Sequence, residues 1–308
     1  MPGPVVTDGE LQFQNLIDAI LDAFYSALEK VLADGGQVVV SESCWPSDGG
    51  QAASLQNVQT YVQNLIGHGW VNANIIPFPD VAIRYIAVGN ELISGNLAQF
   101  VLPAMQNIQN ALNAANLQNK IKVSTSVSTG VLGVSYPPSA GAFTDDARKY
   151  LQPIAGFLAG TGAPLLANIY PYFSYIGNAG QIPIEYALFT SAGPVVTDGN
   201  LQYQNLFDAI LDCFYSALEK VGAGGVRVVV SESGWPSDGG QAALPQNAQT
   251  YVQNLIGHVV NGTPKRPGGI ETYIFAVFDE DRKQPQGTEN HYGLFYPSMQ
   301  PKYSLNIF

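Results

Sequence analysis

Apolar residues recur every three to four positions in several long segments of the chain, the spacing that is typical of amphipathic helices. The clearest segment runs from Leu201 to Val221 and ends at a glycine-rich stop. The pattern predicts four helices: Leu11–Val31, Leu97–Asn116, Ala147–Leu158 and Leu201–Val221. Pro153 lies inside the third helix and is expected to kink or break it, because proline has no backbone N–H to donate.

Short β-rich runs separate these helices and are apolar at both odd and even positions, as expected for strands that are buried on two faces. The predicted strands are Val38–Ser41, Ile83–Val88, Ile121–Val127, Leu165–Tyr170, Val226–Ser231 and Tyr273–Phe278. Strands that alternate with helices indicate a parallel sheet. For one domain over residues 1–308, this favours a (β/α)8 barrel. A doubly wound sheet is the alternative, but no Gly-x-Gly-x-x-Gly follows a strand to support it.

The chain also contains an internal duplication. Residues 3–68 repeat residues 193–258 at a constant offset of 190, with about 54 of the 66 positions identical. Solenoid repeats are adjacent and diverged, whereas these two copies are distant and nearly identical. The pattern therefore indicates a recent duplication, a recombination or an assembled sequence, and not a repeat architecture.

Composition removes several classes of partner. The formal net charge is −11, with no cluster of Lys and Arg, which argues against a nucleic-acid partner. No apolar stretch of about 18 residues predicts a membrane span, and the first residues do not resemble a signal peptide. Cys44 and Cys213 have neither metal-site nor disulfide-framework spacing, and we expect Cys213 to be a buried free thiol.

Two predicted strands end in a carboxylate. Glu91 follows Asn90 after one apolar run, and Glu232 stands between two serines and is followed by Gly234 and Trp235. Catalytic groups of a barrel lie at the C-terminal ends of its strands. Two carboxylates there, about 5–5.5 Å apart, are what retaining glycoside hydrolysis requires. A solvated loop carboxylate is the alternative reading for either residue taken singly.

Longer motifs give this pattern a specific resemblance. They are Arg84 to Glu91, Ile121 to Val134 with Tyr136-Pro137-Pro138-Ser139, Asn168 to Phe173, Ser231 to Ser237, and Gly293 to Pro297. From about Trp70 to the C-terminus the chain resembles the plant endo-β-1,3-glucanases of glycoside hydrolase family 17. The resemblance implies a (β/α)8 barrel, a retaining mechanism, endo-hydrolysis of β-1,3-glucan, and no metal or organic cofactor.

The resemblance also implies roles for individual residues. Glu91 corresponds to the acid/base and Glu232 to the nucleophile of the family, with Asn90 near the sugar 2-hydroxyl. Further residues correspond to substrate contacts or to the polar lining of the cleft: Tyr170, Tyr172, Phe173, Glu280, Lys283, Glu289 and Phe295. Core packing is the alternative for each aromatic residue, and a solvated loop is the alternative for the charged ones. We expect Trp235 to pack beneath the nucleophile.

The chain departs from the family in two places. The early strands of the family barrel are not recognisable, and the duplicate occupies their place with one convincing strand, Val38–Ser41. We therefore expect a barrel that is distorted or incomplete over its N-terminal quarter. Asp279 and Asp281 stand where the family usually has asparagine, which adds negative charge near the site.

The copies carry equivalent glutamates, Glu42 and Glu232. We expect Glu232 to be the functional one, because it leads directly into the following strand and keeps Gly234. Residues 3–68 resemble residues 193–258 closely enough that, beside the expected monomer, exchange between two chains could form dimers.

Three functions stay open on the sequence alone. They are β-1,3-glucan hydrolysis, hydrolysis of mixed-linkage β-1,3-1,4-glucan, and a non-catalytic, glucan-binding product of a rearranged gene. The expected partner is a neutral β-glucan poly- or oligosaccharide. By resemblance the expected location is secreted or vacuolar.

Overall fold

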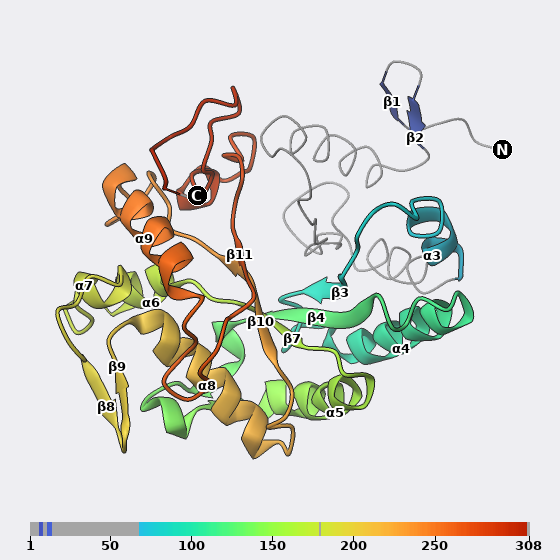
Figure 1. The fold of residues 1–308 in the computed structure, drawn as a ribbon, viewed down its shortest axis with the longest axis horizontal. Coiled ribbons are helices and arrows are strands. Elements are labelled where there is room, and N and C mark those ends of the chain that lie inside the picture. The colour runs from blue at the N-terminus through green and yellow to red at the C-terminus, as the bar shows by residue number, and fades with distance from the viewer. Residues whose placement is uncertain (1–5, 9–10, 14–67, 179, 307–308) are drawn as a thin grey trace. The chain divides into compact units, whose positions relative to one another are not determined.

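The computed structural model describes residues 6–8, 11–13, 68–178 and 180–306. The chain divides into two compact units, residues 1–86 with 104–123 and residues 87–103 with 124–308 (Figure 1). The first unit contains the hairpin β1 (Val6–Asp8) and β2 (Leu11–Phe13), helix α3 (His68–Asn74), and parts of β3 (Tyr85–Asn90), α4 (Ala98–Ala114) and β4 (Lys122–Ser128). Its apolar core includes the buried side chains of Val71, Met105, Leu112 and Ile121.

A five-stranded sheet carries the candidate site. It consists of β3, β4, β7 (Leu165–Asn168), β10 (Val228–Ser233) and β11 (Thr272–Ile274), in the order β11-β10-β7-β4-β3. The pairs β10–β11, β10–β7 and β4–β7 are parallel. Every residue of β7 and β10 is buried, as expected for strands covered on both faces. The predicted α/β class with a parallel sheet is therefore confirmed.

Helices and short elements connect the strands of the second unit. The helices are α5 (Asp145–Thr161), α6 (Pro171–Gly177), α7 (Ile184–Ala187), α8 (Leu206–Lys220) and α9 (Pro245–His258). The short elements are η1 (Thr129–Val131), β5 (Leu132–Val134), η2 (Pro138–Ala140), β6 (Ala142–Phe143), β8 (Val196–Asp198), β9 (Leu201–Tyr203) and η3 (Thr288–Asn290). Helix α8 packs against η2, β6 and β10, and the β8–β9 hairpin extends at the margin of this unit (Figure 1).

Several predicted strand boundaries are corrected by the structure. Strands β3, β4 and β10 end one or two residues later than predicted, so Asn90 and Glu232 lie inside strands. The end of an apolar run does not mark the end of a strand, because polar side chains remain in the hydrogen-bonded ladder. The predicted strand Tyr273–Phe278 is reduced to Thr272–Ile274, followed by an isolated bridge from Phe278 to Phe295.

Two helix predictions also differ from the structure. Helix α5 runs unbroken through the exposed Pro153, because the loss of one helical hydrogen bond on the exposed face does not outweigh the buried face of the helix. The helix predicted from Leu201 begins at Leu206, because Leu201–Tyr203 pairs with Val196–Asp198 as a hairpin. Asn205 caps the helix by accepting a hydrogen bond from the backbone N–H of Asp208 at 2.8 Å.

The described part of the first copy repeats this hairpin. Val6 pairs with Phe13 in one copy, and Val196 pairs with Tyr203 at the same register in the other. The predicted helix Leu11–Val31 therefore starts too early. The rest of that helix, the strand Val38–Ser41, and the closure of the barrel over the N-terminal quarter lie outside the described residues.

A buried carboxylate fastens α8 to the loop after α9. Asp212 is fully buried and accepts hydrogen bonds from the Tyr203 hydroxyl, the Thr263 hydroxyl and the Lys265 backbone N–H. Burial raises the pKa of Asp212 to about 6, although these three donors work in the opposite direction. The folded state consequently binds this proton more tightly than the unfolded chain does.

We predict a pH-dependent contribution of Asp212 to stability. A carboxyl with a raised folded-state pKa stabilises the fold below its unfolded pKa, near 4, and loses that contribution as the pH rises through about 6. The upper limit is about 3 kcal/mol. Denaturant titration from pH 4 to 7 should show a smaller decrease in unfolding free energy for Asp212→Asn than for the parent. Asp145 is exposed, so Asp145→Asn should show the same decrease in unfolding free energy with pH as the parent. An equal decrease for all three proteins would contradict the prediction.

Candidate active site

The side-chain amide of Asn168, at the end of β7, lies at the centre of the site. Its Nδ2 donates to Glu91 Oε1 at 2.8 Å and to Asn90 Oδ1 at 3.0 Å. Its backbone pairs with Glu232 on β10, and the N–H of Ile169 donates to the Glu232 carbonyl at 2.8 Å. Asn168 therefore contacts both predicted catalytic segments, one through its side chain and one through its backbone.

Two serines set the orientation of this amide. Asn168 Oδ1 lies 2.9 Å from Ser126 Oγ and 2.7 Å from Ser231 Oγ, and the two hydroxyls lie 2.7 Å apart. Two hydroxyl protons cannot supply three hydrogen bonds, so at each moment one of these contacts lacks a proton. Either arrangement presents a donor to Oδ1, which leaves Nδ2 facing Glu91.

The backbone before Glu91 turns sharply. Gly89 has φ of +80°, and Glu91 itself has φ of +56°, a region that L-residues seldom occupy. The N–H of Glu91 donates to the Ser126 carbonyl at 2.9 Å, which holds the turn against β4. Strained backbone of this kind is common where a side chain must be presented to a ligand.

The environment of Glu232 differs from that of Glu91. Glu232 is 5% exposed, whereas Glu91 is an exposed residue. The Tyr170 hydroxyl donates to Glu232 Oε2 at 2.8 Å. Burial, and then the charge of Glu232, raise the pKa of Tyr170, so the phenol stays a donor. The structure thus places Tyr170 on the predicted nucleophile.

The remaining predicted aromatic residues separate into exposed and buried ones. Phe173 is 41% exposed and lies edge-on to Tyr170, with ring centroids 5.7 Å apart. Tyr172 is fully buried, and its hydroxyl donates to the Gln241 carbonyl, so its ring presents no surface to a sugar. Trp235 is 1% exposed and packs on Tyr172, so it has no free face on which a sugar could stack. Phe295 is partly exposed and packs on Phe278.

The predicted charged residues form a three-membered cluster. Lys283 Nζ lies 3.2 Å from a Glu280 carboxylate oxygen and 3.1 Å from one of Glu289. Burial alone would lower the pKa of Lys283, but the two carboxylates outweigh it and raise that pKa. The Glu289 charge also makes a small contribution to the raised pKa of Tyr170.

Asp279 carries a charge that the structure compensates. Its carboxylate is almost fully buried, lies 2.6 Å from Lys302 Nζ and accepts the N–H of Gly293. The extra negative charge expected from this substitution is therefore paired with a buried lysine.

Sequence reasoning did not assign a role to Asn168, Ser126, Ser231 or Tyr292. Tyr292 is buried with its ring 5.4 Å from that of Tyr170. The signal that could have found Ser126 is the run of small polar residues Ser124, Thr125 and Ser126 inside a buried strand. Within the described residues, no group of His, Cys, Asp and Glu is arranged to hold a metal ion.

The comparisons with known proteins agree with the α/β fold and its parallel sheet. The profile of Glycosyl hydrolases family 17 matches residues 4–69 and again residues 67–307, and the chain belongs to this family. The first match coincides with the duplicate, which is therefore family 17 sequence as well.

Curated relatives are similar in sequence over most of the chain. A glucan endo-1,3-β-glucosidase of Vitis vinifera is 55% identical over 77% of this chain and 71% of its own length. Glucan endo-1,3-β-glucosidase B of Solanum lycopersicum is 57% identical over 77% of this chain and 67% of its own length.

Solved structures are similar in fold. A plant β-glucan endohydrolase, one of two with distinct substrate specificities, matches with a TM-score of 0.80 and 42% identity, over 98% of both chains. CJP38, a β-1,3-glucanase and allergen of Cryptomeria japonica pollen, matches with a TM-score of 0.81 over 92% of this chain and 93% of its own.

Gly234 distinguishes the two copies of the nucleophile segment. A Cβ at this position would lie 2.2 Å from the Phe275 carbonyl oxygen and 3.1 Å from the Tyr292 ring. The first copy has Cys44 at the equivalent position. That copy cannot take the place of the second unless the backbone near Phe275 moves, which is a steric reason against exchange of the two segments.

We predict that Gly234→Cys, which installs the residue of the first copy, destabilises the fold. Overpacking against a fixed carbonyl typically costs about 1–3 kcal/mol. The unfolding free energy, measured by denaturant titration, should fall by that amount. Gly225→Ala is the control, because a Cβ at Gly225 meets no atom within 4 Å. Equal stability of the two variants would refute the steric argument.

Proposed function

We propose that this chain is a retaining endo-hydrolase of β-1,3-glucan. The observation that carries the proposal is the Asn168 side chain, which touches Glu91 and whose strand pairs with that of Glu232. Family membership supports it, as do relatives named glucan endo-1,3-β-glucosidase. No observation favours specificity for mixed-linkage glucan, and the activity assay described below distinguishes it from β-1,3-glucan specificity.

The two carboxylates have different tasks in this mechanism. The carboxylate of Glu232 attacks the anomeric carbon, and the bond to the leaving sugar oxygen breaks as Glu91 donates a proton to that oxygen. Glu91 then removes a proton from water, which attacks the anomeric carbon and releases Glu232. The burial of Glu232 and the exposure of Glu91 suit a buried nucleophile and an acid/base that must meet water.

Neighbouring residues orient the two carboxylates and contact the sugar. The Tyr170 hydroxyl donates to one oxygen of Glu232 and orients the carboxylate. Asn90, held by Asn168, is placed to meet the 2-hydroxyl of the sugar, and the exposed Phe173 offers a ring for stacking. Glu280, Lys283 and Glu289, which are joined by ion pairs, are the polar residues that we assign to the cleft, and Phe295 is a partly exposed ring that we also assign to it.

Location and assembly extend the proposal. Relatives include a basic vacuolar isoform of Nicotiana plumbaginifolia and an acidic isoform of Zea mays. We propose a secreted or vacuolar location and a monomer over residues 1–308, in which the duplicate occupies the N-terminal quarter of one barrel domain. None of the helices in the described residues is long and apolar enough to cross a membrane.

The proposed function predicts reducing-sugar release from laminarin by the purified chain, and weaker release from barley mixed-linkage glucan. Glu232→Gln and Glu91→Gln should each lower kcat on laminarin by at least about 1,000-fold, because each removes a group that touches the reacting atoms. Stronger activity on barley glucan would favour the mixed-linkage alternative. A folded parent chain that binds laminarin without cleaving it would favour the non-catalytic reading.

The duplication supplies a matched control for this experiment. Glu42→Gln makes the same change in the same local sequence, and we expect it to leave kcat almost unchanged. A loss as deep as that of Glu232→Gln would overturn the assignment of the functional copy.

Asn168→Ala is predicted to lower kcat by about 10- to 100-fold with little change in KM, because misplacing an acid/base affects the transition state more than ground-state binding. Ser126→Ala removes a contact of the same amide but keeps the donors to Glu91 and Asn90, so its loss should be smaller. Steady-state kinetics on laminarin test both variants. A rise in KM at constant kcat for Asn168→Ala would assign the residue to substrate binding instead.

A further inference from the structure

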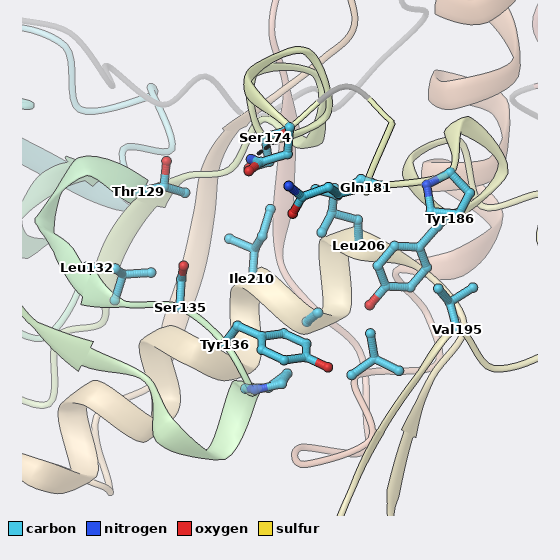
Figure 2. A pocket seen from close by; sticks show the side chains of 16 residues that line it. Thr129, Leu132, Ser135, Tyr136, Ser174, Gln181, Tyr186, Val195, Leu206 and Ile210 are labelled. Atoms are coloured by element: carbon cyan, nitrogen blue, oxygen red, sulfur yellow. Dashed lines mark hydrogen bonds between the residues drawn. The ribbon is translucent and has the colours of Figure 1, made fainter.

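A cavity of about 550 Å³ lies in the second unit, apart from the predicted catalytic residues. Its walls come from η1 and the segment that follows it, from α6 and α7, from the β8–β9 hairpin, and from the first turns of α8 (Figure 2). None of the residues assigned to the hydrolytic site lines it. Its volume falls within the range of about 300–1,000 Å³ that is usual for sites of small ligands.

The lining of this cavity combines apolar surface with neutral polar groups. No charged side chain is among the lining residues. The neutral polar members are Thr129, Ser135, Tyr136, Ser174, Asn178, Gln181 and Tyr186. Leu206 and Ile210 of α8 form the apolar floor, and Tyr136, which is 71% exposed, stands at the rim (Figure 2). This lining suits a neutral ligand with both C–H faces and hydroxyl groups, and it offers nothing to balance a charge.

Tyr186 provides an independent observation. The residue is 3% exposed, and its hydroxyl has no hydrogen-bond partner within the part of the chain that the structure describes. Its side chain points among the other lining residues (Figure 2). The hydroxyl is closed off from solvent, so a bound group reaches it when the ring turns toward the cavity. Because a buried hydroxyl without a partner costs about 1–3 kcal/mol, a ligand that pairs with it after that turn is favoured.

The walls of the cavity are tied together by hydrogen bonds. The backbone N–H and the hydroxyl of Ser139 both donate to the carboxylate of Asp198, at 2.6 and 2.8 Å, which fastens the β8–β9 hairpin to η2. The Asn178 side chain donates to the Ser174 carbonyl at 2.9 Å and closes the end of α6. A cavity whose walls are fixed in this way binds a ligand without first ordering its own segments.

We propose that this cavity is a second saccharide site, which binds one or two sugar units of a neutral β-glucan. The choice of ligand rests on the proposed function. The Tyr186 hydroxyl hydrogen-bonds to a sugar hydroxyl, the Tyr136 ring meets a C–H face at the rim, and Gln181 and Asn178 bind outer hydroxyls. Helix α6 carries Phe173 of the hydrolytic site and Ser174 of the cavity on consecutive residues.

Two sites on one polysaccharide would act together. A chain anchored in the cavity raises the effective concentration of its other segments at the carboxylates. The cavity should therefore lower KM for long glucans and leave KM for short oligosaccharides unaffected.

The experiment uses Glu232→Gln as a background, so that the saccharide is bound and not cleaved. Titration calorimetry with the β-1,3-linked glucose trisaccharide should show two sites per chain. Val195, on the hairpin and 43% exposed, lines the cavity, and Val195→Trp should fill it and reduce the stoichiometry to one. Val5→Trp is the matched control, because Val5 is the equivalent residue of the first copy and should leave two sites.

A second variant avoids any change in shape. Tyr186→Phe removes only the unpaired hydroxyl, so thermal stability should be kept while affinity at the cavity falls about 2- to 12-fold. The proposal would be overturned if calorimetry showed a single site that Val195→Trp does not alter. It would also be overturned if a crystal of the complex showed an ordered water in the cavity and no sugar. A different result is a parent chain that binds the trisaccharide at two sites, loses one of them on Val195→Trp, and yet fails to cleave laminarin. That result would contradict the proposed hydrolysis and still support the second saccharide site.

Discussion

The amide of Asn168 is the constraint on which the proposed hydrolytic site depends. An amide has one accepting and one donating end, and the serine hydroxyls of β4 and β10 take the accepting end. The donating end must then face Glu91 and Asn90. Because all these atoms are on neighbouring parallel strands, the sheet register that buries the valines of β10 also sets the positions of both carboxylates.

Around this amide, the structure compensates negative charge locally. A chain with a formal net charge of −11 brings several carboxylates to one region, and each has a specific partner. Glu232 accepts from Tyr170, Glu280 and Glu289 share Lys283, and the buried Asp279 pairs with Lys302. Neutral donors hold the two groups assigned to catalysis, whereas lysines hold the surrounding ones.

The duplication shows how far local sequence determines structure. Where both copies are described, nearly identical residues form the same hairpin at the same register. The copies differ at Gly234, where an added Cβ would collide with the carbonyl of Phe275, about forty residues further along the chain. A turn needs only its own residues, whereas a close backbone approach needs a particular partner. The same local sequence can therefore form the same turn in both copies, while the close approach to Phe275 depends on Gly234.

The sequence by itself determined the α/β class, the family, and the two glutamates singled out for chemistry, because alternating apolar runs and long motifs are local in the chain. It also placed Trp235 in the core. It did not reveal Asn168 as the link between the two segments, nor that Tyr172 is buried while Phe173, the next residue, is exposed. Those outcomes depend on which side chains meet across strands β4, β7 and β10, over separations of 42 to 77 residues. The cavity beneath Tyr136 has the same origin, since its walls come from segments that only the packing of α8 brings together.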